Sequence, residues 1–167
     1  MNGSSAFLVD AVAIGVGATV VLDLWSVVQR RVLGIPTLDF GMVGRWLGHL
    51  PRGCFRHEAI ARAAPVKGER VLGWSAHYLI GVLFAAMLLA AVGDGWVQSP
   101  TLLPALVFGM LSVVAPFFIM QPGMGAGIAA SRTPAPLKAR LRSLLAHSVF
   151  GLGMYLTACL LLAARGG

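Results

Sequence analysis

Between Gly95 and Ser131 the chain contains no Asp, Glu, Lys or Arg, and most side chains in that segment are apolar. A helix needs about twenty predominantly apolar residues to cross the hydrocarbon core of a bilayer. Thr101 to Met120 is the best span within this segment, and three further stretches meet the same requirement. The predicted membrane spans are residues 7–28, 71–92, 101–120 and 143–164.

The composition of the whole chain agrees with this interpretation. Hydrophobic residues make up 57% of the 167 residues and charged residues only 11%, whereas roughly a quarter of a soluble domain is charged. This balance excludes a disordered chain, a coiled coil and a disulfide scaffold. We therefore expect a single all-α membrane domain over residues 1–167, built as a bundle of four transmembrane helices.

The distribution of Lys and Arg predicts the orientation of the bundle. Of the 13 basic residues, all except Arg165 fall in the loops of residues 29–70 and 121–142. Loops rich in Lys and Arg stay in the cytoplasm, so we expect both loops to be cytoplasmic and both termini to lie outside. The same rule accounts for the net charge of +7. The predicted partners are the bilayer and its anionic headgroups, and not nucleic acid.

The first long loop is expected to be partly helical. Its apolar spacing predicts a surface helix over residues 40–50 with Thr37 as N-cap, and residues 57–62 predict a second short helix. In the later loop, the glycines of residues 121–127 predict a flexible or tight turn, and Thr133 with Pro134 predicts the start of the fourth helix.

Ionisable side chains inside the predicted spans are the first candidates for a functional site, because they are costly in a bilayer. Asp23, His77 and His147 each lie five or six residues inside the cytoplasmic boundary of a different span, which is roughly 7–9 Å along a helix. Each also lies on a stripe of small residues that favours close helix packing. We expect at least two of the three side chains within about 8 Å of each other, with Gln121 as a further partner.

Several ligands fit these groups. Two imidazoles and a carboxylate suit zinc or another divalent metal ion. The same groups could instead relay a proton or bind a polar headgroup, or they could only hydrogen-bond within the helix packing. A haem held by two histidines lacks any further signature, and the glycines at 123, 125 and 127 are only a fragment of a nucleotide-binding motif. The cofactor stays open, with a divalent metal as the candidate.

The first loop holds a second set of candidates. Cys54 and His57 have the spacing of half a metal site, with His49 and Glu58 close in sequence. A zinc-protease helix is excluded at residues 57–61, because Ala61 stands where that motif has its second His. The loop residues that could carry binding or chemistry are Arg45, His49, His57, Glu58 and Glu69.

Several motifs together resemble one bacterial membrane family. They are Asp23-Leu24-Trp25, the segments of residues 43–49 and 55–57, Gly73-Trp74 with His77-Tyr78, and residues 121–125. Over nearly its whole length the chain resembles the uncharacterised integral membrane family catalogued as domain-of-unknown-function family 2938. The resemblance implies a small multi-pass protein of the bacterial inner membrane, and it brings no known activity.

Three function classes stay open. The leading one is a small transporter-like or ligand-binding membrane protein built around Asp23, His77 and His147, which would need a homodimer to form a pathway. The alternative is a non-catalytic accessory or assembly protein whose basic loop docks a partner or anionic lipid. A membrane enzyme using the His and Glu residues of the loop ranks third, and we assign no catalytic residue.

A topology reporter tests the expected orientation. A reporter that is active only outside the cytoplasm should be active when fused after Gly167, because the distribution of Lys and Arg predicts an external C-terminus. A second reporter that is active only in the cytoplasm should be silent at the same position. Activity of the cytoplasmic reporter would contradict the orientation.

Overall fold

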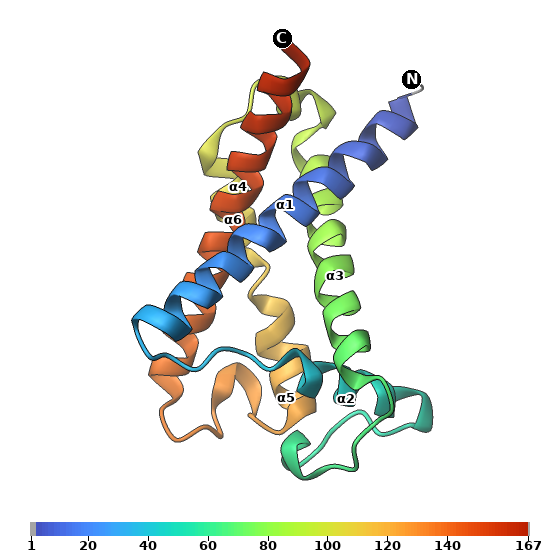
Figure 1. The fold of residues 1–167 in the computed structure, drawn as a ribbon, viewed down its shortest axis with the longest axis vertical. Coiled ribbons are helices and arrows are strands. Elements are labelled where there is room, and N and C mark those ends of the chain that lie inside the picture. Colours follow the sequence, from blue (N-terminus) through green and yellow to red (C-terminus); the bar gives the residue numbers. More distant parts are fainter. Residues whose placement is uncertain (1–2, 167) are drawn as a thin grey trace. The chain divides into compact units, whose positions relative to one another are not determined.

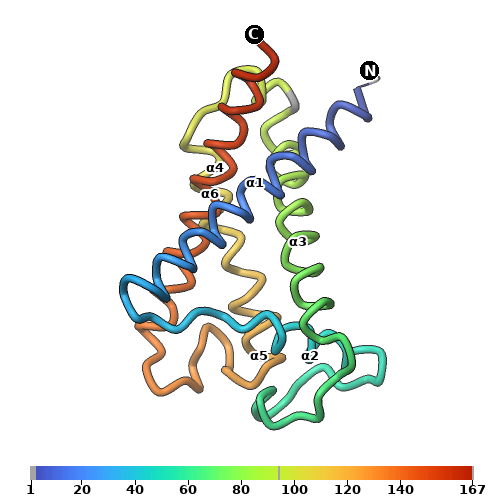
Figure 2. Tube along the Cα trace, viewed as in Figure 1, coloured from blue at the N-terminus to red at the C-terminus, as the bar shows by residue number. Residues whose placement is uncertain are grey.

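The computed structural model describes residues 3–166, whose regular elements are all helical. Four segments are long and apolar enough to cross a membrane: Gly3–Val32, Glu69–Val92, Leu102–Met124 and Pro136–Gly166. They confirm the number and approximate places of the predicted spans (Figure 1; Cα trace in Figure 2). The chain divides into two compact units. The first combines the segment up to Pro36, Tyr78–Leu111 and the segment from Ala146, and the second combines Thr37–His77 with Ser112–Leu145.

The first unit packs helices around one apolar core. It contains α1 (Gly3–Val32), the part of α3 (Glu69–Val92) from Tyr78, α4 (Leu102–Leu111) and the part of α6 (Pro136–Gly166) from Ala146. The short helix η3 (Asp94–Gln98) connects α3 to α4. Side chains from all four long helices are buried in this core, among them Ile14, Ala18, Leu88, Ala105, Phe150 and Met154.

Small residues allow these helices to cross at backbone contact. Gly15 of α1 lies against the backbone of α3 at Val82, and Gly109 of α4 lies against Gly151 of α6. In both places an added Cβ would overlap backbone atoms of the neighbouring helix. Lipid tails are as apolar as the side chains, so close packing must supply the attraction between membrane helices. Gly15 and Gly151, which belong to two of the small-residue stripes predicted on the spans, lie in these contacts.

One ion pair joins α1 to α6 near the chain ends. Arg165 donates hydrogen bonds to both carboxylate oxygens of Asp10, whose side chain is only 8% exposed. The pair holds the N-terminal end of α1 and the C-terminal end of α6 at the same end of the first unit (Figure 1). Asp10 was not among the predicted site residues, and the structure shows that this buried carboxylate is paired with Arg165.

The second unit consists of short helices and turns. Its first part holds α2 (Phe40–His49), η1 (Leu50–Arg52), η2 (Ile60–Arg62) and the first turns of α3. Its second part holds η4 (Pro116–Met120), α5 (Gln121–Met124), η5 (Ile128–Ala130) and the first turns of α6. Gly44 of α2 and Gly73 of α3 lie where an added Cβ would overlap backbone, so these two helices are also in backbone contact.

Two predictions for the first loop are wrong in detail. The N-cap of α2 is Asp39 and not Thr37, because the Asp39 carboxylate accepts a hydrogen bond of 2.8 Å from the N–H two residues further on. The second short helix is reduced to one turn at Ile60–Arg62, because Ala59 before it has an extended backbone. The loop is partly helical, as expected.

The predicted start of the fourth helix is also wrong. α6 begins at Pro136 and not at Thr133, whose hydroxyl instead donates a hydrogen bond of 2.8 Å to the carbonyl of Ala130. Proline suits the first helical turn, where its missing N–H costs no hydrogen bond. The start of α6 is therefore at Pro136 and not at the Thr133-Pro134 pair.

The third span is an interrupted helix, not the continuous helix expected over residues 101–120. α4 ends at Leu111, and the chain continues through the π-helical turn η4 into α5. Pro116 has no N–H to donate to the carbonyl four residues earlier, and its ring crowds that carbonyl. The wider π turn relieves this conflict, and the N–H of Gln121 bonds to the carbonyl of Pro116.

The crossing of α1 and α3 can be tested with one methyl group. Gly15→Ala should destabilise the protein by about 1–3 kcal/mol, because the new Cβ would overlap the backbone at Val82. Gly3→Ala on the same helix is the matched control, since no atom lies within 4 Å of a Cβ there. Thermal unfolding in detergent measures both variants, and equal melting temperatures would contradict the close crossing.

Candidate functional site

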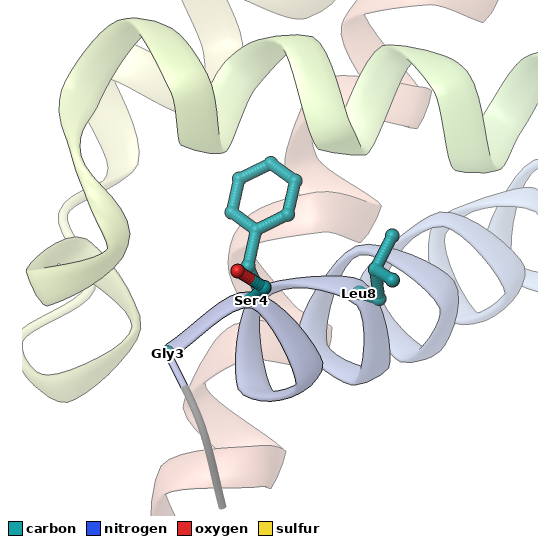
Figure 3. Close-up of a pocket in the computed structure, with 4 residues that line it drawn as sticks. Gly3, Ser4 and Leu8 are labelled. Atoms are coloured by element: carbon teal, nitrogen blue, oxygen red, sulfur yellow. The ribbon is translucent and has the colours of Figure 1, made fainter.

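The structure has a pocket at the N-terminal end of α1. It is lined by Gly3, Ser4, Phe7 and Leu8 (Figure 3). None of these four side chains titrates near neutral pH or is a common metal ligand. The pocket therefore offers no acid–base or metal-binding group, and the candidate side chains lie elsewhere.

Asp23 and His147 both belong to the first unit. The Asp23 carboxylate accepts a hydrogen bond of 2.9 Å from the Tyr78 hydroxyl, which ties α1 to α3. His147 lies where α6 crosses α4, and its carbonyl oxygen is next to Gly109. Each of these two candidates therefore sits at a helix–helix contact of the first unit.

His77 and Gln121 belong to the second unit. The His77 ring stacks on Phe40 with centroids 4.0 Å apart and meets Trp74 edge-on at 5.7 Å. The Gln121 amide nitrogen donates to the Ser143 hydroxyl at 3.3 Å, while its buried amide oxygen has no hydrogen-bond partner within the described part of the chain. The convergence of Asp23, His77 and His147 on one ligand stays a prediction.

Arg45 and Glu69 form a forked ion pair in the second unit. Nε and Nη2 of Arg45 each donate a hydrogen bond of 2.8 Å to a different carboxylate oxygen of Glu69. Nη1 of Arg45 donates to the carbonyls of Ala61 and Ala63 at 3.4 and 3.3 Å. The hydrogen bond with Glu69 raises the pKa of the Arg45 guanidinium, which stays charged. These two loop candidates hold the loop in place, so we assign them a structural role.

Three other residues of the first loop are brought together by a tight turn. α2 ends at His49, and η1 runs into Gly53, whose φ of 75° lies in the left-handed region that favours glycine. The chain reverses there, and the N–H of Cys54 donates to the carbonyl of His49 at 3.3 Å. His57 follows three residues later, and its N–H donates to the carbonyl of Gly123 at 2.9 Å.

Three metal-binding atoms meet at this turn, and we call them the His–Cys–His site: His49 Nδ1, Cys54 Sγ and His57 Nε2. His57 Nε2 lies 3.3 Å from His49 Nδ1 and 3.5 Å from Cys54 Sγ. One ligand atom from each residue lies within 4.8 Å of the others, and all three residues are partly exposed. Glu58 is exposed and is not part of this group within residues 3–166.

The hydrogen bonds of the two imidazoles direct their lone pairs toward each other. His49 Nε2 lies 2.9 Å from the carbonyl oxygen of Ala64, and His57 Nδ1 lies 3.3 Å from that of Gly123. A carbonyl oxygen only accepts, so both of these nitrogens carry the hydrogen. In neutral rings the opposite nitrogens then present two lone pairs across 3.3 Å. The Cys54 thiol can donate to His57 Nε2 at 3.5 Å or to the carbonyl of Arg56 at 3.7 Å. A metal ion would instead use the lone pairs of both rings and the deprotonated sulfur, and metal-bound histidines commonly bond a carbonyl through their other nitrogen.

Two of the three separations in the His–Cys–His site match those around a tetrahedral ion, and the third, between His49 Nδ1 and Cys54 Sγ, is within 4.8 Å. Zn–N bonds of about 2.0 Å and Zn–S bonds of about 2.3 Å place two nitrogens about 3.3 Å apart, and a nitrogen and a sulfur about 3.5 Å apart. The corresponding separations here are 3.3 and 3.5 Å. Two imidazoles and one thiolate suit zinc or copper, and they leave a fourth coordination position for another ligand.

The sequence indicated only part of this site. The spacing of Cys54 and His57 marked two ligands, and His49 was close enough in sequence to be considered with them. The two carbonyls that orient the imidazoles, from Ala64 and Gly123, could not be found from ligand spacing. The glycine-rich motif of residues 121–125 was the one signal that pointed to the Gly123 segment.

Comparisons with known proteins identify a family and no activity. No curated protein and no solved structure matches this chain. The family described as "Protein of unknown function (DUF2938)" matches residues 12–161, which include the three residues of the His–Cys–His site. The match covers most of the chain and confirms the resemblance read from its motifs. The chain belongs to this family of proteins of unknown function.

Proposed function

We propose that this protein is a small membrane protein that binds a transition metal ion through His49, Cys54 and His57. Zinc and copper(I) are the candidate ions, because both accept imidazole and thiolate ligands. The observation that supports the proposal is the approach of two imidazole nitrogens, His49 Nδ1 and His57 Nε2, to 3.3 Å beside the Cys54 sulfur. Binding in this site needs no catalytic residue, and we propose none.

Three protein ligands favour exchange of the ion over permanent storage. Structural zinc sites close the tetrahedron with four protein ligands, whereas here the fourth position is left for water or an incoming ligand. The partial exposure of all three residues gives such a ligand access. We therefore propose that the protein receives or releases the ion at the cytoplasmic face of the bacterial inner membrane.

Transport across the bilayer would require further polar groups within the spans. Asp23, His77 and His147 are the groups we propose for that role, since ionisable residues in membrane spans are costly unless they have a partner or a function. A homodimer would supply the wider pathway that four helices lack. The His–Cys–His site would then be the place where the ion enters or leaves.

Metal titration tests the His–Cys–His site. Purified, metal-free protein should bind one zinc ion per chain, and Cys54→Ala should weaken binding by more than about tenfold because it removes a ligand. Cys159→Ala is the matched control, because Cys159 is the other free cysteine and lies outside the site. Competition with a chromophoric chelator measures the affinities, and equal affinity in both variants would exclude Cys54 as a ligand.

The same titration distinguishes the two proposed metal sites. His57→Ala should lose the zinc ion, whereas Asp23→Ala and His147→Ala should keep it if the loop holds the only tight site. Loss of zinc in the Asp23 and His147 variants together with unchanged binding in His57→Ala would instead favour the intramembrane residues.

A second candidate function is the docking of anionic lipid by the same loop. Phe55 is 64% exposed, and the neighbouring Arg52 and Arg56 are also exposed. An aromatic ring flanked by cations suits the headgroup region of an anionic membrane. Arg45 is not part of this surface, because its guanidinium is held by Glu69.

Lipid retention tests this second function. The double variant Arg52→Ala with Arg56→Ala should retain less phosphatidylglycerol during purification, since each cation near an anionic surface contributes about 1 kcal/mol. Native mass spectrometry measures the bound lipid, and retention of zwitterionic phosphatidylcholine is the control. Unchanged retention of phosphatidylglycerol would count against docking through these two residues.

A further inference from the structure

The carbonyl of Gly123 connects the metal-binding loop to the end of the third span. It accepts two hydrogen bonds from His57, one of 2.9 Å from the backbone N–H and one of 3.3 Å from Nδ1. Gly123 lies within α5, and α5 ends the apolar segment Leu102–Met124. The residue that orients a metal ligand therefore belongs to a different part of the sequence from the ligands themselves.

Packing joins the same two segments. The indole of Trp46 covers Gly123 so closely that an added Cβ would lie 2.5 Å from its Nε1, and that Nε1 donates to the carbonyl of Phe55 at 3.0 Å. Gly125, with φ of 98°, lies against the backbone carbonyls of His57 and Glu58. The metal-binding loop and the turn of residues 121–126 thus pack as one body within the second unit.

We propose that metal occupancy of the His–Cys–His site is coupled to the ordering of residues 121–127, with Gly123 as the positioning residue. This inference rests on the proposed metal-binding function. An ion on His57 Nε2 fixes the imidazole ring, and a fixed ring holds its Nδ1–H on the Gly123 carbonyl. Coupling between two sites is reciprocal, so displacement of Gly123 lowers the affinity for metal.

The coupled segment carries a buried polar group, the amide of Gln121. Gln121 begins α5, and its carbonyl accepts a hydrogen bond of 2.8 Å from the N–H of Ala126 in the same turn. Its amide oxygen is buried and has no hydrogen-bond partner within the described part of the chain. Metal binding in the loop therefore orders the segment that carries the Gln121 amide.

Hydrogen exchange measures the coupling in the intact protein. Saturating zinc should slow exchange of the backbone amides of residues 121–127 in the wild type, and it should have no such effect in Cys54→Ala. The turn of residues 94–98 is the internal control, because it belongs to the first unit. Zinc that binds without slowing exchange in residues 121–127 overturns the coupling and leaves the proposed function intact, whereas absence of zinc binding overturns both.

A glycine pair tests the reciprocal effect. Gly123→Ala should weaken zinc binding by about 10–100-fold, the loss typical of groups that orient a ligand, although Gly123 offers no side-chain ligand. Gly95→Ala should bind zinc like the wild type, because no atom lies within 4 Å of a Cβ at that position. Wild-type affinity in a folded Gly123→Ala variant overturns the positioning role, and the exchange measurement decides the coupling if that variant does not fold.

Discussion

The forked hydrogen bonds between Arg45 and Glu69 hold the loop on which the candidate metal site depends. Each carboxylate oxygen of Glu69 accepts from Arg45 at 2.8 Å, and one of them also accepts from the N–H of Val66 at 2.9 Å. Arg45 in turn bonds the carbonyls of Ala61 and Ala63. A guanidinium fork matches a carboxylate in both distance and direction, so this one pair fixes α2, the loop and the start of α3 together. The Arg45–Glu69 pair therefore also holds His49 and Ala64 within hydrogen-bonding distance of each other.

The helices themselves depend on a different constraint. Backbone groups in a bilayer must be satisfied within the protein, and glycines at 15, 81, 109 and 151 allow the helices to approach closely. Pro116 disturbs this pattern in the third span, where a π-helical turn replaces the regular hydrogen bond. α4 belongs to the first unit and α5 to the second, which contains the metal-binding loop.

Hydropathy and small-residue spacing were sufficient to predict the four spans and several of their contacts, because both patterns are local in sequence. The helix caps were predicted less well. Thr37 and Asp39 are both good N-cap residues. The hydrogen bond from the N–H of Gly41 to the Asp39 carboxylate decides between them. At the start of the fourth helix, Thr133 donates to the carbonyl of Ala130 and does not cap the helix, which begins at Pro136.

The candidate site was predicted in part for a similar reason. Cys54 and His57 are three residues apart, and such spacing is visible in a sequence. The left-handed turn at Gly53 brings His49 to them, and the carbonyls of Ala64 and Gly123 select which imidazole nitrogens face the sulfur. These contacts join residues up to 66 positions apart, so no local pattern reveals them. His77 stacks on Phe40, and its part in a shared site with Asp23 and His147 stays a prediction.

X-ray absorption of the zinc-loaded protein tests the His–Cys–His site most directly, because it reports the atoms bound to the ion. One sulfur at about 2.3 Å and nitrogen or oxygen ligands at about 2.0 Å are expected. The sulfur contribution should disappear in Cys54→Ala and persist in Cys159→Ala. A first shell of nitrogen and oxygen alone in the wild-type protein would contradict the assignment of Cys54 and the metal centre built around it.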